Sequence, residues 1–430
     1  MVYKEIPTSV ATFMETITDL CGETHADWAK NFNAAFANTL LTTVKRHEDG
    51  TTFLLTGDIP AMWLRDSTAQ VRPYLVIAKE DEDLASMISG LVKKQFYYII
   101  TIDPYANAFN ESANGAGHQT DDTEMNDWIW ERKYEIDSLC YPIQLAYLLY
   151  KNTGRTDQFN DDFVTGIKKA LEVFVTEQNH EESPYRFERD TWRKEDTLTH
   201  DGKGAPVKPV GLTWSGFRPS DDACKYGYLI PSNMFAVVVL GYIQEIFTTV
   251  LEDAAIVAQA KKLQADIEAG IKAYGLTTNQ AGEEVYAYEV DGFGNGTLMD
   301  DSNVPNLIAA PYLGYGSMED PLYLQTRKTL LSSENPYFYE GKYAKGIGSS
   351  HTPENYVWPI AMAMEGMTTT DKEEKKRILD QLVATDAGTN LMHEGFDVDD
   401  PSQYTREWFS WANMMFCELV MDYFDIRVEK

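Results

Sequence analysis

The stretch IVAQAKKLQADIEAGIKAYG (residues 256–275) carries apolar side chains that recur at steps of three and four. Such spacing places them on one stripe of a helix, and Gly275 follows as a stop signal. The stretch FNDDFVTGIKKALEVF (residues 159–174) repeats the pattern. Similar helical patterns occupy residues 28–44, 84–98, 138–150, 378–383 and 406–425.

From these stretches we expect roughly a dozen helices from end to end, a number that suits a toroid of paired helices. Pro231, Ser232 and Asn233 precede a further apolar run and supply capping side chains for a helix that starts near Met234. Strand signals are brief, and they predict hairpins within loops rather than a sheet domain. They cover residues 51–55, 185–189 and 285–290.

No linker rich in proline, glycine or serine divides the 430 residues, so we expect a single domain over residues 1–430. Hydrophobic residues make up 43% of the chain and aromatic residues 12%, as in ordinary packed proteins. The 67 acidic and 37 basic side chains give a net charge of -30, which would repel nucleic acids and anionic lipids. We therefore expect neither as a partner.

The lack of a recognisable targeting signal and the spacing of the cysteines both predict a protein of the reducing cytoplasm. The N-terminus lacks the basic region and apolar core of a secretory signal, and the longest apolar run, residues 234–243, is too short to cross a bilayer. The four cysteines are scattered, without the spacing of a disulfide framework or a zinc site. We expect reduced thiols in packed helices.

The first of four chemically rich stretches, residues 57–75, combines Trp63, Arg65 and Asp66 in a predicted loop. An adjacent Arg and Asp offer donors and an acceptor to neighbouring sugar hydroxyls, while a tryptophan offers a flat apolar face. The competing interpretation is a surface ion pair beside a core tryptophan.

The second stretch, residues 128–137, alternates charged and aromatic side chains before a predicted helix. Two interpretations are open for its charged residues, Glu131, Lys133, Glu135 and Asp137. They line a polar cleft, or they form the exposed face and acidic first turn of that helix.

The third stretch, residues 213–234, contains the adjacent carboxyl groups of Asp221 and Asp222. Close like charges and burial favour the protonated form of a carboxyl group, so one of the two is a candidate acid. The alternative is a Ser-Asp-Asp cap at the start of a helix.

The fourth stretch comprises residues 390–401 and the aromatic segment 404–411. Glu394, between His393 and Gly395, is a candidate base, and Trp408 a candidate apolar platform. The alternative is an ordinary loop glutamate with a turn at residues 399–401.

Other catalytic signatures are missing from the sequence. It contains no phosphate-binding glycine loop, dinucleotide fingerprint, Gly-x-Ser-x-Gly elbow or His-Glu-x-x-His pair. Nothing in it requires a metal, so we expect no metal or other cofactor. His351 is either a loop histidine with a structural partner or a donor to a sugar hydroxyl.

Six motifs taken together closely resemble glycoside hydrolase family 125, the metal-independent exo-α-1,6-mannosidases. They are DIPAMWLRDS (58–67), WERKYEIDSLCYP (130–142), FRPSDD (217–222), DDSNVP (300–305), SSENPY (332–337) and MHE (392–394). They occur in order from about residue 20 to the C-terminus, and the first twenty residues match least.

The resemblance implies an all-α fold, an (α/α)6 barrel with short β-hairpins in its loops, and an inverting hydrolase of terminal α-1,6-linked mannose. On the matching positions Asp221 is the general acid and Glu394 the general base, with Asp222 as the alternative acid. Inversion needs the two carboxyl groups about 6.5–9.5 Å apart, to admit a water molecule. Sugar recognition then falls to the remaining candidates, namely Trp63, Arg65, Asp66, Glu131, Asp137, Asp222, His351 and Trp408.

The expected partner is a mannose-containing oligosaccharide, such as an N-glycan fragment, and the expected assembly is a monomer or weak homo-oligomer. Two other functions are compatible with the motifs. One is an inverting enzyme of the same barrel type that acts on a glucoside or a disaccharide. The other is a catalytically silent sugar-binding or scaffold protein that keeps the cleft.

Overall fold

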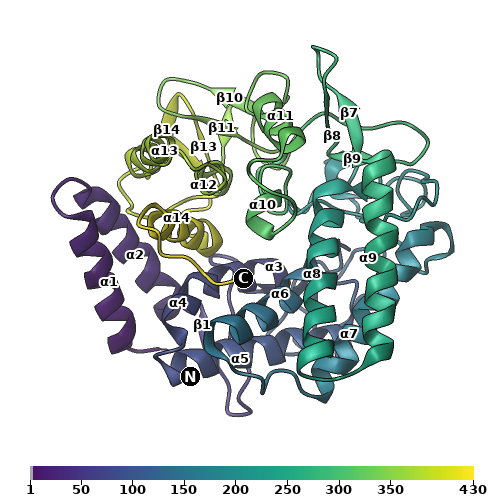
Figure 1. Ribbon diagram of the computed structural model, residues 1–430, viewed down its shortest axis with the longest axis horizontal. Coiled ribbons are helices and arrows are strands. Elements are labelled where there is room, and N and C mark those ends of the chain that lie inside the picture. The colour runs from purple at the N-terminus through teal and green to yellow at the C-terminus, as the bar shows by residue number, and fades with distance from the viewer. Residues whose placement is uncertain (1–2) are drawn as a thin grey trace.

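The computed structural model describes residues 3–430, and most of this chain is helical, with small sheets between the helices (Figure 1). The α-helices are α1 Thr8–Cys21, α2 Ala26–Thr42, α3 Leu64–Val71, α4 Leu75–Ala78, α5 Glu82–Tyr97, α6 Ile136–Thr153, α7 Asp161–Thr176, α8 Ile230–Thr249, α9 Ala254–Tyr274, α10 Ala310–Leu313, α11 Pro321–Leu330, α12 Pro359–Met367, α13 Lys372–Ala384 and α14 Ser410–Tyr423.

The strands are short and pair antiparallel in sheets of two or three. They are β1 Val44–Arg46, β2 Thr52–Leu54, β3 Met62–Trp63, β4 Ala108–Phe109, β5 Ile129–Glu131, β6 Tyr228–Leu229, β7 Leu276–Thr278, β8 Glu284–Tyr286, β9 Glu289–Val290, β10 Phe338–Glu340, β11 Lys345–Ile347, β12 Tyr356–Val357, β13 Gly395–Asp397 and β14 Asp400–Thr405.

Helices α3, α6, α8, α10, α12 and α14 lie around the centre of the molecule, and others lie outside them (Figure 1). Helix α3 packs against α6, α6 against α8, and α8 against the single turn of α10. Helix α12 packs against α14, which also contacts α3. Each of several central helices has an outer partner: α2 packs on α14, α5 on α6, α9 on α8 and α13 on α12. The C-terminal segment ends near the middle of this ring (Figure 1).

Burial differs between central and outer helices in a way that the sequence explains. In α14 every residue from Ser410 to Asp422 is buried, whereas α9 buries only one side, at Ile256, Ala260, Leu263, Ile267, Gly270 and Ile271. An outer helix has one face in solvent, so its apolar residues form a stripe. A central helix contacts neighbours all round and carries no such stripe.

Helix α8 illustrates the central type. It is long and apolar enough to span a membrane by length and composition alone. In the structure it packs against α6, α9 and α10, and 67% of its most apolar window is buried. Packing within the ring of helices accounts for this apolar composition.

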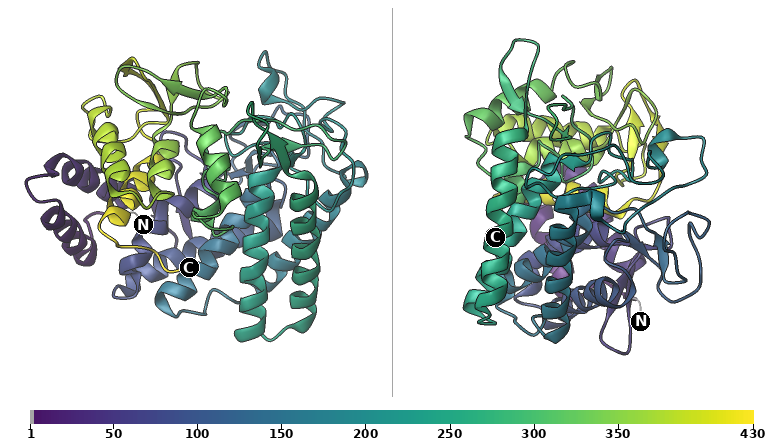
Figure 2. Two further views of the ribbon diagram at one scale, coloured as in Figure 1. Left: turned by 45° about the horizontal axis from the view of Figure 1, so that its top comes forward. Right: turned by 90° about the vertical axis from the view of Figure 1, so that its right-hand side faces the viewer.

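Several small sheets fix the N-terminal ends of the central helices. Strand β3 runs directly into α3, and β6 directly into α8, while β12 ends two residues before α12 begins. Their partners come from distant segments, with Trp63 opposite Ala108, Tyr228 opposite Val290, and Val357 opposite Phe396. The loops that carry the chemically rich stretches therefore gather at this end of the central helices (Figure 2).

The predicted helices are confirmed, and Gly275 follows α9 as expected. Strands β2, β8 and β9 confirm two of the three strand predictions. The third is wrong, because within residues 185–189 only Glu188 forms an isolated bridge, to Asp122.

Three local predictions are also wrong. Residues 64–71, expected to be a loop, form α3, all of whose side chains are buried. Helix α8 starts at Ile230 without a side-chain cap, because the side chain of Asn233 instead bonds the backbone of Thr213 and Leu229. No helix begins at Asp221 or Asp222, so the capping interpretation of that pair fails.

Candidate active site

A cavity of about 180 Å³ opens at the N-terminal ends of α3, α12 and α14. The residues that immediately precede these helices, Trp63, Trp358 and Phe409, all line it. Aromatic rings at these positions give the cavity apolar faces of the kind that pack against sugar rings. Six predicted site residues line the cavity: Trp63, Arg65, Asp66, Asp221, His351 and Glu394.

Asp221 enters the cavity from a strained turn. Its backbone φ of 68° is in the left-handed region, which is uncommon outside glycine and is often found at functional sites. Its backbone N–H donates to Arg218 O at 2.9 Å, and the buried ammonium of Lys133 donates to its carbonyl oxygen at 2.7 Å. These two contacts hold the turn, so the carboxyl group has a fixed position.

The side chain of Asp221 is 22% exposed, and its Oδ1 accepts hydrogen bonds from Arg65 at 3.2 Å and from Asn107 at 3.3 Å. Burial raises the pKa of this carboxyl group, but the charge of Arg65 and other neighbours outweighs that effect and lowers the pKa below its usual value.

Glu394 approaches the cavity from the base of the β13–β14 hairpin. Its backbone N–H donates to Thr405 O at 3.2 Å, and Arg406 lies 3.8 Å from its Oε1. The ring of His393 stacks on Tyr404 with 3.8 Å between centroids, which joins the two strands on the other side. Glu394 is 8% exposed, so it is a nearly buried carboxyl group that faces a cavity.

Arg65 is the buried cation around which the acidic groups collect. Its guanidinium lies 2.5 Å from Glu135, 3.2 Å from Asp137 and 3.5 Å from Asp66, besides its contact with Asp221. One cation cannot neutralise four buried carboxylates. Burial accordingly raises the pKa of Asp66 to about 6 and that of Asp137 to about 6, against the opposing charge of Arg65.

Asp222 does not line the cavity, although it is adjacent to Asp221. It is fully buried and accepts hydrogen bonds from Ser350 at 2.6 Å, His351 at 2.9 Å and Arg193 at 3.2 Å. Burial raises the pKa of Asp222, but its bonds to His351 and Ser350 outweigh that effect and lower it. The same contact raises the pKa of His351 to about 9 against the effect of burial, which makes its ring a cationic donor at neutral pH.

The other predicted residues lie outside the cavity lining. Glu131 is buried behind it and binds Asn107 at 3.2 Å and Arg189 at 2.8 Å. Asp137 lies behind Arg65, and Trp408 donates its indole N–H to Ser410 at 3.1 Å. The structure therefore brings six of the ten candidates to one cavity and places Glu131, Asp137, Asp222 and Trp408 around it.

The sequence prediction missed several residues of the site. Trp358 and Trp411 line the cavity beside Asn303 and Arg406, and Asn107 bonds Asp221. Trp411 and Arg406 fall within segments that the sequence had singled out, but Asn107 follows an ordinary aromatic loop and carries no signal of its own.

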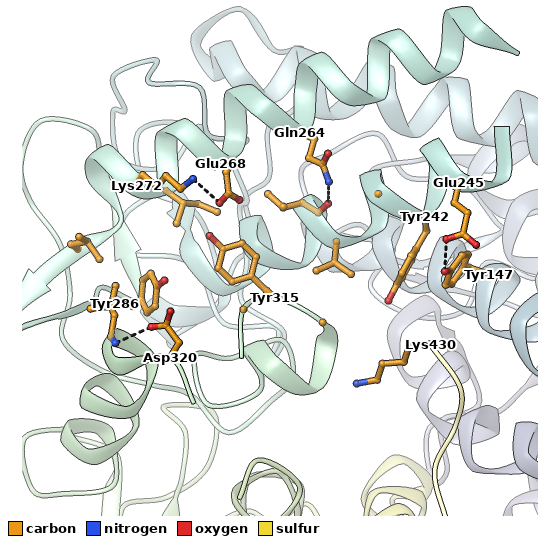
Figure 3. A pocket seen from close by; sticks show the side chains of 18 residues that line it. Tyr147, Tyr242, Glu245, Gln264, Glu268, Lys272, Tyr286, Tyr315, Asp320 and Lys430 are labelled. Carbon is orange, nitrogen blue, oxygen red and sulfur yellow. Dashed lines mark hydrogen bonds and ion pairs between the residues drawn. The ribbon is translucent and has the colours of Figure 1, made fainter. Parts of the chain in front are cut away.

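A larger groove of about 880 Å³ lies between α8, α9 and the segment after α10 (Figure 3). Its carboxylates already have structural partners: Glu245 binds Tyr147 at 2.7 Å, Glu268 binds Lys272 at 3.3 Å, and Asp320 caps α11. It offers no pair of carboxyl groups comparable to Asp221 and Glu394. Among residues 3–430, no group of three or more His, Cys, Asp and Glu side chains is placed to hold a metal ion.

Comparisons with known proteins match this chain over nearly its whole length. The family model described as metal-independent α-mannosidase (GH125) matches residues 25–421. The Meiotically up-regulated gene 157 protein of Schizosaccharomyces pombe is 37% identical over 420 residues, which cover 92% of this chain and 82% of that protein.

A solved structure from Streptococcus pneumoniae is 58% identical, with a TM-score of 0.97, and the match covers 99% of this chain and 100% of the other. It is described as a metal-independent α-mannosidase in a non-productive complex with α-1,6-mannobiose. A bacterial glucoamylase in complex with acarbose matches with a TM-score of 0.59 at 12% identity, over 97% of this chain and 58% of its own. That second likeness concerns the fold alone.

Proposed function

Because the chain belongs to the metal-independent α-mannosidases of glycoside hydrolase family 125, we propose that it is an inverting exo-α-1,6-mannosidase. It removes the terminal non-reducing mannose from α-1,6-linked mannosides. The observation that carries this proposal is the end-to-end match to the Streptococcus pneumoniae enzyme whose structure holds α-1,6-mannobiose.

The size of the cavity supports exo action. At about 180 Å³ it is smaller than the pockets of about 300–1,000 Å³ that take drug-sized ligands. A site of this size suits one terminal sugar ring, with the rest of the glycan outside.

Two carboxyl groups on the cavity wall support direct displacement by water. We assign Asp221 as the general acid that protonates the departing oxygen and Glu394 as the general base that takes a proton from the attacking water. Asp222 is the weaker candidate for the acid, because it is fully buried and three donors hold it as a carboxylate. The separation expected for inversion is about 6.5–9.5 Å between the two carboxyl groups.

Recognition of the sugar falls to the rest of the cavity wall. Protonated His351 and the Arg65–Asp66 pair offer donors and an acceptor to hydroxyl groups. Trp63 and Trp358 offer apolar faces to the ring.

The fold that we propose is an (α/α)6 barrel that forms one catalytic domain. Outer and central helices alternate along the chain from α2 to α14, if α4 is counted with α3, and this order is the one that such a barrel requires. The family match over residues 25–421 supports a single domain. We further propose that the substrate is an N-glycan fragment. We also propose that the enzyme acts in the cytoplasm, and cell fractionation tests this location.

Release of mannose from linkage-defined disaccharides tests the function. The purified chain is incubated with α-1,2-, α-1,3- and α-1,6-mannobiose and with isomaltose, and the Glu394→Gln variant serves as the inactive control. We expect mannose from the α-1,6 isomer alone. Turnover of isomaltose in its place would indicate a glucosidase, and binding of mannobiose without turnover a sugar-binding protein.

A further inference from the structure

The carboxyl groups of Glu135 and Asp221 are held by the same two side chains. Arg65 donates from Nη1 to Glu135 at 2.5 Å and from Nη2 to Asp221 at 3.2 Å. Asn107 Nδ2 lies 3.4 Å from Glu135 Oε1 and 3.3 Å from Asp221 Oδ1. Because one amide nitrogen contacts both groups, Glu135 Oε1 and Asp221 Oδ1 are neighbours, and a proton on one group can form a hydrogen bond to the other.

A hydrogen bond between two carboxyl groups requires a proton, because two carboxylates have only acceptors. Glu135 is fully buried, so ionisation of both groups would also place two negative charges together in a dry site. Burial and the charge of Asp221 raise the pKa of Glu135 well above its usual value, in spite of Arg65. The shared proton therefore resides mainly on Glu135 in the free protein, and Asp221 is the carboxylate.

Other charged and titratable groups face this pair from every side. Asp66 and Arg65 come from α3, Glu131 from β5, Lys133 from the segment after β5, Asp137 from α6, Cys224 from the loop before β6, and His351 from the loop before β12. The carboxyl groups of this cluster outnumber its three cations, Arg65, Lys133 and His351, so the surroundings favour a proton on the pair.

This arrangement addresses a requirement of the proposed reaction, on which the inference rests. A general acid must carry a proton when the bond breaks, yet the pKa of Asp221 is lowered. We propose that Glu135 is a positioning residue that holds the catalytic proton and passes it to Asp221 along their hydrogen bond.

The proton of Glu135 first moves to Asp221. The bond from C1 to the glycosidic oxygen then breaks with its electron pair on the oxygen, which takes this proton from Asp221. The attacking water forms the new bond to C1 and gives its proton to Glu394. The pair has then lost one proton and Glu394 has gained one, and exchange with water restores both groups.

The neighbouring carboxyl groups do not fit this role. Asp222 is occupied by Ser350, His351 and Arg193. Asp137 binds the same nitrogen of Arg65 as Glu135, but its other oxygen is buried without a hydrogen-bond partner, and it does not bond Asp221. Asp137 is therefore the matched control.

Glu135→Gln tests the proposal, because glutamine fills the same space and donates to Asp221 but cannot release a proton. With α-1,6-mannobiose we expect kcat/KM to fall at least about 100-fold, the usual contribution of a general acid. With α-mannosyl fluoride, whose leaving group departs without protonation, we expect a loss of less than about 10-fold. The alkaline limb of the pH profile with mannobiose should also move to lower pH.

Asp137→Asn should lower kcat/KM by the same factor for both substrates, because it disturbs Arg65 without removing the proton. An equal loss on both substrates for Glu135→Gln, or no loss on either, would overturn the role of Glu135. Should Glu135→Gln fail to fold, Glu135→Asp keeps the proton at a longer distance and should again lose more activity on mannobiose than on the fluoride.

The inference can fail separately from the proposed function. A wild-type protein that turns over neither substrate refutes the function itself. If the wild type turns over both mannobiose and the fluoride, but Glu135→Gln loses the same activity on each, only the proton relay is refuted.

Discussion

Asp221 and Asp222 are neighbours in the chain, yet their carboxyl groups have separate partners. Asp221 lines the cavity and binds Arg65 and Asn107, whereas Asp222 is fully buried and binds Ser350, His351 and Arg193. The left-handed backbone of Asp221 permits this divergence, because it turns successive side chains to different sides. The pair thus supplies one carboxyl group that lines the cavity and one that is buried outside its lining.

Replacement of the two carboxyl groups should separate their duties. Asp221→Asn is expected to lower kcat/KM for α-1,6-mannobiose at least about 100-fold while it retains activity on α-mannosyl fluoride, since only the first substrate needs an acid. Asp222→Asn should lower both activities together, because it disorients His351. If Asp222→Asn instead lost activity on α-1,6-mannobiose but kept it on α-mannosyl fluoride, Asp222 would be the general acid.

Ionisation of Asp222 and His351 should also appear in the pH dependence of stability. The pKa of His351 is raised from 6.5 to about 9, so its contribution is fully present below pH 6.5 and is lost as the pH rises through 9. In Asp222→Asn this contribution disappears, and we expect the free energy of unfolding at pH 6 to fall by on the order of 1–3 kcal/mol. Urea unfolding of the wild type and the variant at pH 6 and pH 10 measures this difference in the free energy of unfolding. An equal difference at the two pH values would contradict the pairing of Asp222 with His351.

The ionisation of Asp66 should destabilise the fold, whereas that of His351 stabilises it. Its folded pKa of about 6 lies above the usual 3.8, so it costs stability as the pH rises through this interval. We expect Asp66→Asn to be more stable than the wild type at pH 8 by on the order of 1–3 kcal/mol, with little difference at pH 4. Lower activity should accompany the gain, as at other strained sites. A variant less stable than the wild type at pH 8 would mean that Arg65 fully compensates Asp66.

Gly57 positions the aromatic wall of the cavity. Its φ of 146° disfavours any side chain, and a Cβ there would lie 2.5 Å from the carbonyl oxygen of Trp408. Gly57 bridges Phe409, which lines the cavity. Gly57→Ala should cost about 1–3 kcal/mol in thermal unfolding and raise KM for mannobiose. Gly50→Ala, whose Cβ meets nothing within 4 Å, is the control for a left-handed glycine and should leave KM unchanged.

Much of the fold was predictable because outer helices such as α7 and α9 must place apolar residues on a single stripe. The central helix α3 was not, since all eight of its residues are buried, among them Arg65, Asp66 and Gln70, and no periodicity marks it. Its polar residues are buried because they form the site, which is where local patterns are expected to fail.

The candidate site was predictable only in part, for a related reason. Motifs pointed to Asp221 and Glu394, which lie far apart in the sequence and line one cavity. No local pattern could show that Arg65 and Asn107 each contact both Glu135 and Asp221, because four separate segments supply these contacts.

Proton NMR of the first mannose released from α-1,6-mannobiose identifies the anomer that forms before mutarotation, and this anomer reports the face of the sugar that water attacks. The action of Asp221 as acid and Glu394 as base predicts β-mannose. Release of α-mannose, or of no mannose at all, would contradict it.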